Sequence, residues 1–279
     1  MQLVVLSGVS GSGKSLALKA LEDADYFCVD NLPAELIEPL AQYAVKRGES
    51  RVAIGADARS RESLGHLPEI VARERARGTD VRVIFLDATD ESLVRRFGET
   101  RRPHPLAEEG RSIEQSIVEE RRLLAWLSEI GQRVDTSGLT PPQLRSWIRE
   151  AVVTDPSRLT LCFQSFGYKT GVPLDADFVF DTRFLANPHY DAALRAKTGR
   201  DPEVVAFLEG EAQAPPFVDD IERFLKRWLP RFVMEHRASV NVAIGCTGGC
   251  HRSVYVADRL AERFKAEYQV VVRHRDLEC

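Results

Sequence analysis

The sequence predicts an α/β fold with two domains, each built on a parallel sheet covered by helices. Three observations support this prediction. Short apolar runs alternate with amphipathic segments, two of these runs end in glycine-rich turns, and a polar turn cluster at 154–157 separates two such series. We therefore expect a first domain at residues 1–154 and a second α/β domain at residues 155–279.

The first domain opens with an apolar run at 2–8 and an amphipathic segment at 15–24, which predict a strand and the helix after it. Two further apolar runs, at 52–58 and 81–88, reach an aspartate and predict strands. The segment 112–130 predicts a helix because apolar residues recur in it at helical spacing: Ile113, Ile117, Leu123, Leu124 and Leu127.

The second domain repeats the alternation. Three apolar segments, 158–167, 175–185 and 241–249, predict strands. The segment 253–267 predicts a closing helix, because one face of it is apolar: Val254, Ala257, Leu260, Ala261 and Phe264.

Composition excludes some classes of protein. Lys and Arg total 38 against 42 Asp and Glu, a formal charge of −4, so the chain is no general polycation that coats nucleic acid. No apolar run approaches the roughly 20 residues of a membrane span, and the start lacks the basic region of a signal peptide. Five scattered cysteines favour free thiols in a reducing compartment. We expect a cytoplasmic protein without a membrane partner.

Residues 8–15 fit the G-x-x-x-x-G-K-[ST] pattern between a predicted strand and a predicted helix. Glycines let the loop turn tightly, so that its N–H groups and the helix start converge on phosphate oxygens. Lysine reaches the β and γ phosphates, and serine joins the shell of Mg²⁺. The pattern predicts a site for ATP or GTP with Mg²⁺, formed by Gly8, Val9, Ser10, Gly11, Ser12, Gly13, Lys14 and Ser15.

The metal also needs a carboxylate. Asp87 ends a predicted strand and is a candidate for holding Mg²⁺ through water, with Ser15, but an aspartate there equally suits a helix N-cap. Asp57 is a second candidate. Nearby arginines either cover the phosphates as a lid or form a solvated face: Arg95, Arg96, Arg101 and Arg102.

A second anion site is predicted where residues 246–253 follow an apolar strand and precede a helix. The spacing C-x₅-R-[ST] is that of the phosphate loop of cysteine-dependent phosphatases. Glycines free the backbone to wrap an anion, Arg252 offers a fork of donors, and positive potential stabilises a thiolate at Cys246. The alternative is an ordinary turn with a buried cysteine. The candidate residues are Cys246, Thr247, Gly248, Gly249, His251, Arg252 and Ser253.

Polar residues upstream are further candidates for this second site. They are Lys169, Asp181, Arg183, Asn187 and His189. The density of polar side chains from 181 to 189 favours their convergence on the loop, although a single such residue is usually solvated.

With both sites defined, the whole chain resembles the RapZ family, the YvcJ-like P-loop nucleotide-binding proteins. The resemblance rests on SGVSGSGKS at 7–15, ALEDADYFCVDNLP at 20–33 and TRRPHPL at 100–106. It rests above all on two long blocks, FGYKTGVPLDADFVFDTRFLANPHYD at 166–191 and VAIGCTGGCHRSVYVADRLAERF at 242–264.

The resemblance implies a kinase-like first domain that binds ATP at 8–15, and a guanine-nucleotide segment at Asp57, Ala58, Arg59 and Ser60. It implies that the second domain binds glucosamine-6-phosphate, through His189, Thr247, Gly248, Gly249, His251 and Arg252. It further implies a homotetramer that binds small regulatory RNA, presents it to the endoribonuclease RNase E and so regulates glucosamine-6-phosphate synthesis. Any enzymatic activity is at most weak ATP or GTP hydrolysis.

The chain departs from this pattern at its basic residues. RNA-binding members carry a lysine-rich tail, whereas residues 250–279 here hold six Lys or Arg against five Asp or Glu, and Cys250 stands where a lysine is expected. Because RNA affinity depends on neutralising phosphates, weak or absent RNA binding is expected. A smaller patch remains at Arg252, Lys265, Arg273 and Arg275.

Three functions stay open on the residues: a regulatory adapter that senses a sugar phosphate, a small-molecule kinase or NTPase, and a phosphatase. The NTPase would use Lys14, Ser15 and Asp87. The phosphatase would use Cys246 as its nucleophile and Arg252 as its phosphate clamp, and it would need an acid that the sequence does not identify.

Overall fold

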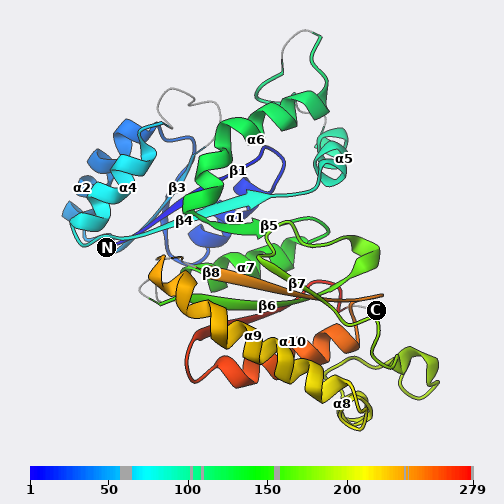
Figure 1. Ribbon diagram of the computed structural model, residues 1–279. Helices are drawn as coiled ribbons and strands as arrows, with labels where there is room; N and C mark the ends of the chain where they lie inside the picture. The colour runs from blue at the N-terminus through cyan, green and yellow to red at the C-terminus, as the bar shows by residue number, and fades with distance from the viewer. Residues whose placement is uncertain are drawn as a thin grey trace. The chain divides into compact units, whose positions relative to one another are not determined.

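The computed structural model describes residues 1–56, 65–100, 103–107, 110–153, 158–235, 237 and 239–277. The chain divides into two compact units, Met1–Val153 and Thr154–Cys279, and the predicted boundary lies beside this division. Each unit contains a parallel sheet with helices packed on it (Figure 1). The predicted α/β fold class is confirmed.

The first unit has a five-stranded parallel sheet in the order β2-β3-β1-β4-β5. The central strand β1 pairs with β3 on one side and β4 on the other, so that Val5 lies between Ile54 and Val83. The strands are β1 (Gln2–Gly8), β2 (Phe27–Val29), β3 (Arg51–Gly55), β4 (Asp80–Asp87) and β5 (Gln132–Asp135).

Helices cover both faces of this sheet because successive strand residues point to opposite sides. Leu3 and Val5 pack with α2, α4 and α6, whereas Val4 and Leu6 pack with α1 and α7. The helices are α1 (Lys14–Glu22), α2 (Ile37–Lys46), α4 (Leu67–Ala76), α5 (Asp90–Thr100), α6 (Ile113–Ile130) and α7 (Pro141–Val153), and a short 3₁₀ turn η1 (Ala34–Leu36) precedes α2.

The helix α6 confirms the helical spacing predicted for 112–130. A capping box starts it, in which the Ser112 hydroxyl accepts from the Gln115 N–H and the Gln115 side chain accepts from the Ser112 N–H. Leu124 and Leu127 are fully buried, whereas Ile113 is 37% exposed at the first turn. The apolar stripe therefore packs in the core along most of its length.

The second unit has a four-stranded parallel sheet in the order β7-β8-β6-β9. Its core lies between this sheet and three helices, which gather on one face of it in Figure 1. The elements are β6 (Thr160–Gly167), η3 (Tyr168–Thr170), β7 (Phe178–Asp181), η4 (Pro188–Tyr190), α8 (Pro202–Glu209), α9 (Ala214–Met234), β8 (Ser239–Cys246), α10 (Arg252–Phe264) and β9 (Gln269–His274).

The predicted apolar face of the closing helix is confirmed, since all five of its residues are buried. The helix itself ends at Phe264, before the predicted end at 267, and the edge strand β9 follows. The edge strands β2, β5 and β9 were not expected from the sequence, because β2 and β5 have only three and four residues and β9 leaves its apolar residues partly exposed.

The cysteines differ from one another. Cys28, Cys162 and Cys246 carry free thiols, as expected. Cys250 is disulfide-bonded, so the expectation of free thiols is wrong at that position.

Among the described residues, no helix combines the length and the apolar character that crossing a membrane requires.

Gly8 fixes the turn that follows the central strand. Its φ is +147°, and a Cβ there would lie 2.1 Å from the Leu86 carbonyl oxygen. That same oxygen accepts the Val9 N–H at 3.0 Å. The backbone at position 8 therefore lies against β4, and only a residue without a side chain fits there.

We expect Gly8→Ala to lower the free energy of unfolding by about 3 kcal/mol, since it adds an unfavourable φ and a clash with rigid backbone. Gly48→Ala is the matched control: Gly48 also has positive φ, at +79°, but nothing lies within 4 Å of its Cβ position, so about 1 kcal/mol is expected. Denaturant unfolding of both variants measures the difference. Equal losses would contradict the close approach at Gly8.

Candidate functional site

The loop between β1 and α1 has the backbone conformation that the phosphate-binding pattern requires. Gly8, Gly11 and Gly13 all have positive φ, and α1 begins at Lys14 directly after them. Lys14 Nζ donates to the Gly8 carbonyl at 2.6 Å, so its ammonium lies over the loop. Ser15 is exposed in the first turn of α1. The loop amides, the lysine and the serine hydroxyl are thus brought together at one helix start.

A buried carboxylate braces this loop. Glu120 on α6 is fully buried and accepts both the Ser10 N–H, at 2.7 Å, and the Ser10 hydroxyl, at 2.8 Å. Burial raises the pKa of Glu120, but hydrogen bonds from His104 and Ser10 and the charge of Lys14 outweigh it, so its pKa is lowered. The carboxylate therefore stays charged and fixes the loop.

His104 completes the brace. Its Nδ1 accepts the Leu106 N–H at 3.0 Å, so the ring proton sits on Nε2, which lies 3.2 Å from Glu120 Oε2. Sequence reasoning missed both residues as part of the site. The only available signal was the TRRPHPL block, because Ser10 and Glu120 lie 110 residues apart.

Asp87, the predicted Mg²⁺ ligand, is buried at the end of β4 with a guanidinium against it. Arg121 Nε lies 3.1 and 3.2 Å from its two oxygens, and the Ala88 N–H donates to Oδ1 at 2.8 Å. Burial raises the pKa of Asp87, and Arg121 only partly offsets this. The backbone N–H that Asp87 accepts belongs to Ala88, which lies before α5 begins at Asp90. Asp87 therefore does not cap this helix, which was the alternative to a Mg²⁺ ligand.

Arg96 connects the loop to the segment after β5. Its Nη1 donates to the Gly11 carbonyl at 3.0 Å and its Nη2 donates to the Thr136 carbonyl at 2.7 Å. The Thr136 hydroxyl in turn donates to the Ser12 carbonyl at 2.9 Å. A pocket of about 150 Å³ lies beside these groups, and Leu16, Leu139, Pro141 and Leu144 contribute apolar side chains to it.

The remaining first-domain candidates have separate outcomes. Arg95 is exposed and pairs with Glu99 at 3.9 Å, which is the solvated alternative. Arg101 and Arg102 lie outside the described residues, as does the whole segment 57–60 with Asp57, Ala58, Arg59 and Ser60.

In the second unit, the loop after β8 borders a pocket of about 480 Å³. Three of the upstream candidates line it with the loop: Lys169, Asn187 and His189. Arg195, which sequence reasoning missed, lines it too. The full lining is Lys169, Asn187, His189, Arg195, Ala196, Cys246, Thr247, Gly248, Cys250, His251 and Arg252.

Asp181 and Arg183 do not line this pocket. They pair with each other at 2.7 Å, and the Arg183 guanidinium lies 3.9 Å from the centre of the Tyr168 ring. Arg183 still contributes through its backbone, because its carbonyl accepts from Arg252.

Cys246 lies at the end of β8, almost fully buried, with donors directed at its sulfur. The Gly249 N–H donates to Sγ at 3.1 Å and the Ser253 hydroxyl donates at 3.2 Å. Burial raises the pKa of the Cys246 thiol, but these bonds and the N–H groups of Ser253 and His251 outweigh it, so its pKa is lowered. Gly249 has φ +84°, and a Cβ there would meet the Gly167 nitrogen at 2.8 Å.

Arg252 is buried at the start of α10, with one edge held by backbone. Its Nη1 donates to the carbonyls of Arg183, at 2.8 Å, and Leu185, at 3.0 Å, while Nη2 donates to the Thr247 hydroxyl at 3.3 Å. Its Nε is buried and has no hydrogen-bond partner in the described part of the chain. The Nε and Nη2 edge therefore remains available to an anion.

Two histidines flank the loop. Burial lowers the pKa of His251 more than its hydrogen bonds to the carbonyls of Leu194 and Arg195 raise it, so its ring is mainly neutral at pH 7. His251 Nε2 is buried and finds no partner among the described residues. His189 is exposed, and the centre of its ring lies 6.3 Å from that of His251.

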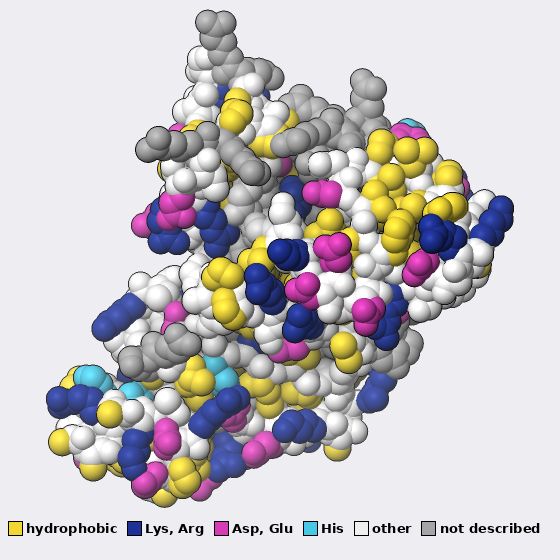
Figure 2. All heavy atoms as spheres, turned by 180° about the vertical axis from the view of Figure 1, so that it is seen from behind, with side chains coloured by type: hydrophobic (Ala, Val, Ile, Leu, Met, Phe, Trp, Pro, Cys, Tyr) yellow, Lys and Arg dark blue, Asp and Glu magenta, His cyan; other side chains and the backbone are white. Residues whose placement is uncertain are grey.

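The basic patch predicted at the carboxyl-terminal segment is not a patch. Arg252, Arg273 and Arg275 are each buried, and only Lys265 is exposed. Figure 2 shows basic side chains interspersed with acidic ones on the face in view. The prediction was wrong because counting charges does not reveal which of them the fold buries.

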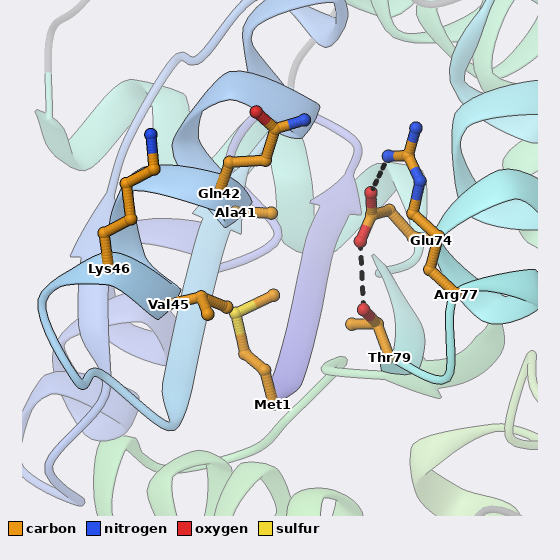
Figure 3. A pocket seen from close by; sticks show the side chains of 8 residues that line it. All are labelled: Met1, Ala41, Gln42, Val45, Lys46, Glu74, Arg77 and Thr79. Atoms are coloured by element: carbon orange, nitrogen blue, oxygen red, sulfur yellow. Dashed lines mark hydrogen bonds and ion pairs between the residues drawn. The ribbon is translucent and has the colours of Figure 1, made fainter.

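A third pocket, of about 370 Å³, lies at the amino-terminal ends of β1 and β4 (Figure 3). Glu74 in its wall is bonded through one oxygen to Arg77, at 2.6 Å, and through the other to Thr79, at 2.9 Å. These bonds tie the end of α4 to the start of β4. Ligands of parallel sheets bind at the carboxyl ends of the strands, opposite to this pocket. We therefore assign the residues in the wall of this pocket a role in the fold and no ligand.

Comparison with known proteins covers both units. The RapZ-like N-terminal domain matches residues 1–156 and the RapZ C-terminal domain matches residues 159–278. Similar curated proteins include a "Nucleotide-binding protein" of Thiobacillus denitrificans, 53% identical over 99% of this chain and 100% of that one, and one of Chromobacterium violaceum, 51% identical over 99% of each.

Two solved structures align with about half of the chain. Shikimate kinase of Bacteroides thetaiotaomicron is 15% identical with a TM-score of 0.35, over 53% of this chain and 94% of that one. A gluconokinase of Sinorhizobium meliloti is 16% identical with a TM-score of 0.33, over 55% and 90%. Both TM-scores are low.

We expect Glu120→Gln to lower the free energy of unfolding by about 1–3 kcal/mol and to weaken nucleotide binding. The glutamine amide would place N–H groups where Glu120 now accepts hydrogen bonds from Ser10 and His104. Glu129→Gln, exposed on the same helix, is the control. Because the folded pKa of Glu120 is lowered, the wild-type advantage is complete above about pH 4.3 and disappears as folded Glu120 takes up a proton at lower pH. Unfolding at several pH values measures it; a pH-independent difference would contradict it.

The free thiols of Cys28 and Cys246 should be alkylated in different pH ranges, because their pKa values are shifted in opposite directions. Burial and the charge of Glu22 raise the pKa of Cys28 to about 11, whereas the pKa of Cys246 is lowered from 9.0. Since the thiolate is the reactive form, iodoacetamide labelling of Cys246 should reach half its maximal rate below pH 9, whereas that of Cys28 should reach half its maximal rate only near pH 11. Peptide mass spectrometry measures both. Ser253→Ala should move the pH profile of Cys246 labelling to higher pH. If the profiles of Cys28 and Cys246 coincided in the unmodified protein, the opposite pKa shifts would be refuted.

Proposed function

The chain belongs to the RapZ-like family, and on this premise we propose that it is a regulatory adapter with two ligands. The first unit binds ATP or GTP with Mg²⁺ at residues 8–15, and the second unit senses glucosamine-6-phosphate in the pocket of about 480 Å³. The observation that carries the proposal is the buried Arg252 beside that pocket, whose Nε finds no hydrogen-bond partner in the described part of the chain.

The cationic lining of the pocket supports a phosphorylated ligand. A phosphate between Arg252 and the loop would meet the Nε and Nη2 donors and the start of α10, which favours an anion. Lys169 and Arg195 add positive charge from other segments. Asn187 and His189 offer polar groups to the hydroxyls of a sugar. The pocket's volume also suits a monosaccharide phosphate.

The first unit supports a nucleotide in the same way. Lys14 and the loop amides suit the phosphates, and the small apolar pocket beside Arg96 suits a flat base. The Ser15 hydroxyl would hold Mg²⁺, which neutralises phosphate charge when bound. Asp87 would contribute through water, because Arg121 already occupies its carboxylate.

The proposed adapter is cytoplasmic and homo-oligomeric. That it binds a small regulatory RNA and presents this RNA to RNase E stays a prediction. The burial of Arg252, Arg273 and Arg275 removes three cations from the RNA surface expected at the carboxyl-terminal segment. RNA affinity scales with the number of phosphates neutralised, so we expect any RNA binding through this segment to be weak.

Calorimetric titration with glucosamine-6-phosphate tests the sensor. We expect Lys169→Ala to weaken binding about tenfold, because it removes one charged partner of the phosphate. Lys265→Ala is the matched control, since Lys265 is also exposed on the second unit but does not line the pocket. Arg252→Lys should weaken binding further, with its fold checked by thermal unfolding.

Two results would overturn the sensor assignment. One is the absence of binding heat with the unmodified protein. The other is equal affinity in Lys169→Ala and Lys265→Ala, which would place the ligand elsewhere.

A further inference from the structure

The binding of a phosphate by the second unit does not explain why a cysteine lies at position 246 in the pocket. Capture of an anion needs the cations and the loop amides, yet a sulfur lies among them and lines the same pocket. Neutral thiols are poor donors, and a thiolate would repel a phosphate dianion. A group so placed suits attack on phosphorus better than recognition.

We propose that Cys246 is a nucleophile that takes the phosphoryl group from a phosphomonoester bound in this pocket. The inference rests on the proposed function, because it needs the pocket to accept a sugar phosphate or a similar ester. It adds an activity, hydrolysis through a phosphocysteine, to what sensing requires.

The contacts of the sulfur favour the thiolate. Sγ accepts from Ser253 Oγ at 3.2 Å and from the Gly249 N–H at 3.1 Å. These donors lower the pKa of the thiol although the site is almost fully buried. A thiolate held by fixed donors reacts without reorganising its surroundings.

The position of Arg252 favours a phosphate over the sulfur. Carbonyls of Arg183 and Leu185 hold Nη1 and so fix the guanidinium plane. Nε, which has no partner among the described residues, and Nη2, which donates to the Thr247 hydroxyl, form the edge that remains to bind two phosphate oxygens. Five residues separate Cys246 from Arg252, and the loop between them brings both side chains to the lining of one pocket.

The reaction balances in two steps. In the first, the Cys246 thiolate attacks phosphorus, an S–P bond forms, the P–O bond to the sugar breaks, and the leaving oxygen takes a proton from His189, which lines the same pocket. In the second, water attacks phosphorus, the S–P bond breaks to return the thiolate, and His189, which gave up its proton in the first step, takes a proton from the attacking water. Inorganic phosphate and the free alcohol are the products.

Ser253 acts mainly in the second step. Its hydroxyl donates to Sγ and so stabilises the thiolate as it leaves phosphorus. Removing it should slow hydrolysis of the phosphocysteine more than its formation, and the intermediate should accumulate.

The experiment measures inorganic phosphate released from p-nitrophenyl phosphate and from glucosamine-6-phosphate by the full chain. We expect release to be lost in Cys246→Ser and unchanged in Cys28→Ser, the control for a free thiol in the other unit. In Ser253→Ala we expect steady turnover to fall about tenfold. Mass spectrometry after acid quenching should then show one phosphoryl group on the Cys246 peptide.

Calorimetry on the same preparations separates the two proposals. Binding of glucosamine-6-phosphate without phosphate release and without phosphocysteine would overturn the nucleophile and leave the sensor intact. Absence of binding would overturn the sensor, and with it this inference. Equal release by Cys246→Ser and the unmodified protein would show that another group, or a contaminant, performs the reaction, and would also overturn it.

Discussion

Parallel strand pairing is the constraint on which both candidate sites depend. It brings the carboxyl ends of neighbouring strands to one edge of a sheet, where the chain must turn before the next helix. At Gly8 this turn passes so close to the Leu86 carbonyl that no side chain fits between them. At Gly249 the same need arises against the Gly167 nitrogen. Each turn delivers backbone N–H groups to the start of a helix, which is where an anion is favoured.

Buried charges then hold the two turns in shape. Glu120 fixes the first through the Ser10 N–H and hydroxyl, and Arg252 fixes the second through two backbone carbonyls. A buried charge is costly unless its hydrogen bonds are satisfied. Glu120 is satisfied by the protein itself, whereas the Nε of Arg252 has no hydrogen-bond partner among the residues that the structure describes. This difference is why we describe Glu120 as a brace only, whereas Arg252 is both a brace and the group that we propose to bind a ligand.

Burial also separates the charges that serve the pocket from those available to a macromolecule. Arg273 and Arg275 are buried, and the Arg275 side chain donates to the Thr170 hydroxyl at 2.8 Å. Such cations shape the carboxyl edge of the second sheet but do not reach an RNA backbone, because phosphate neutralisation needs solvent-exposed charge. Lys169 and Arg195 do line the pocket. The cations that line it thus favour a small phosphorylated ligand.

The sequence by itself determined the fold class, the main strands, the closing helix and the two loops at 8–15 and 246–253, because each is written in contiguous residues with a local physical meaning. Tertiary structure decided the rest. Glu120 reaches Ser10 across 110 residues, Arg96 joins the loop to Thr136, and Arg195 joins the second pocket. No local pattern encodes these contacts, since they arise only when the order of strands places distant segments together. The exposure of a side chain is decided in the same way, which is why the predicted basic patch was wrong and the edge strands β2, β5 and β9 were not predicted.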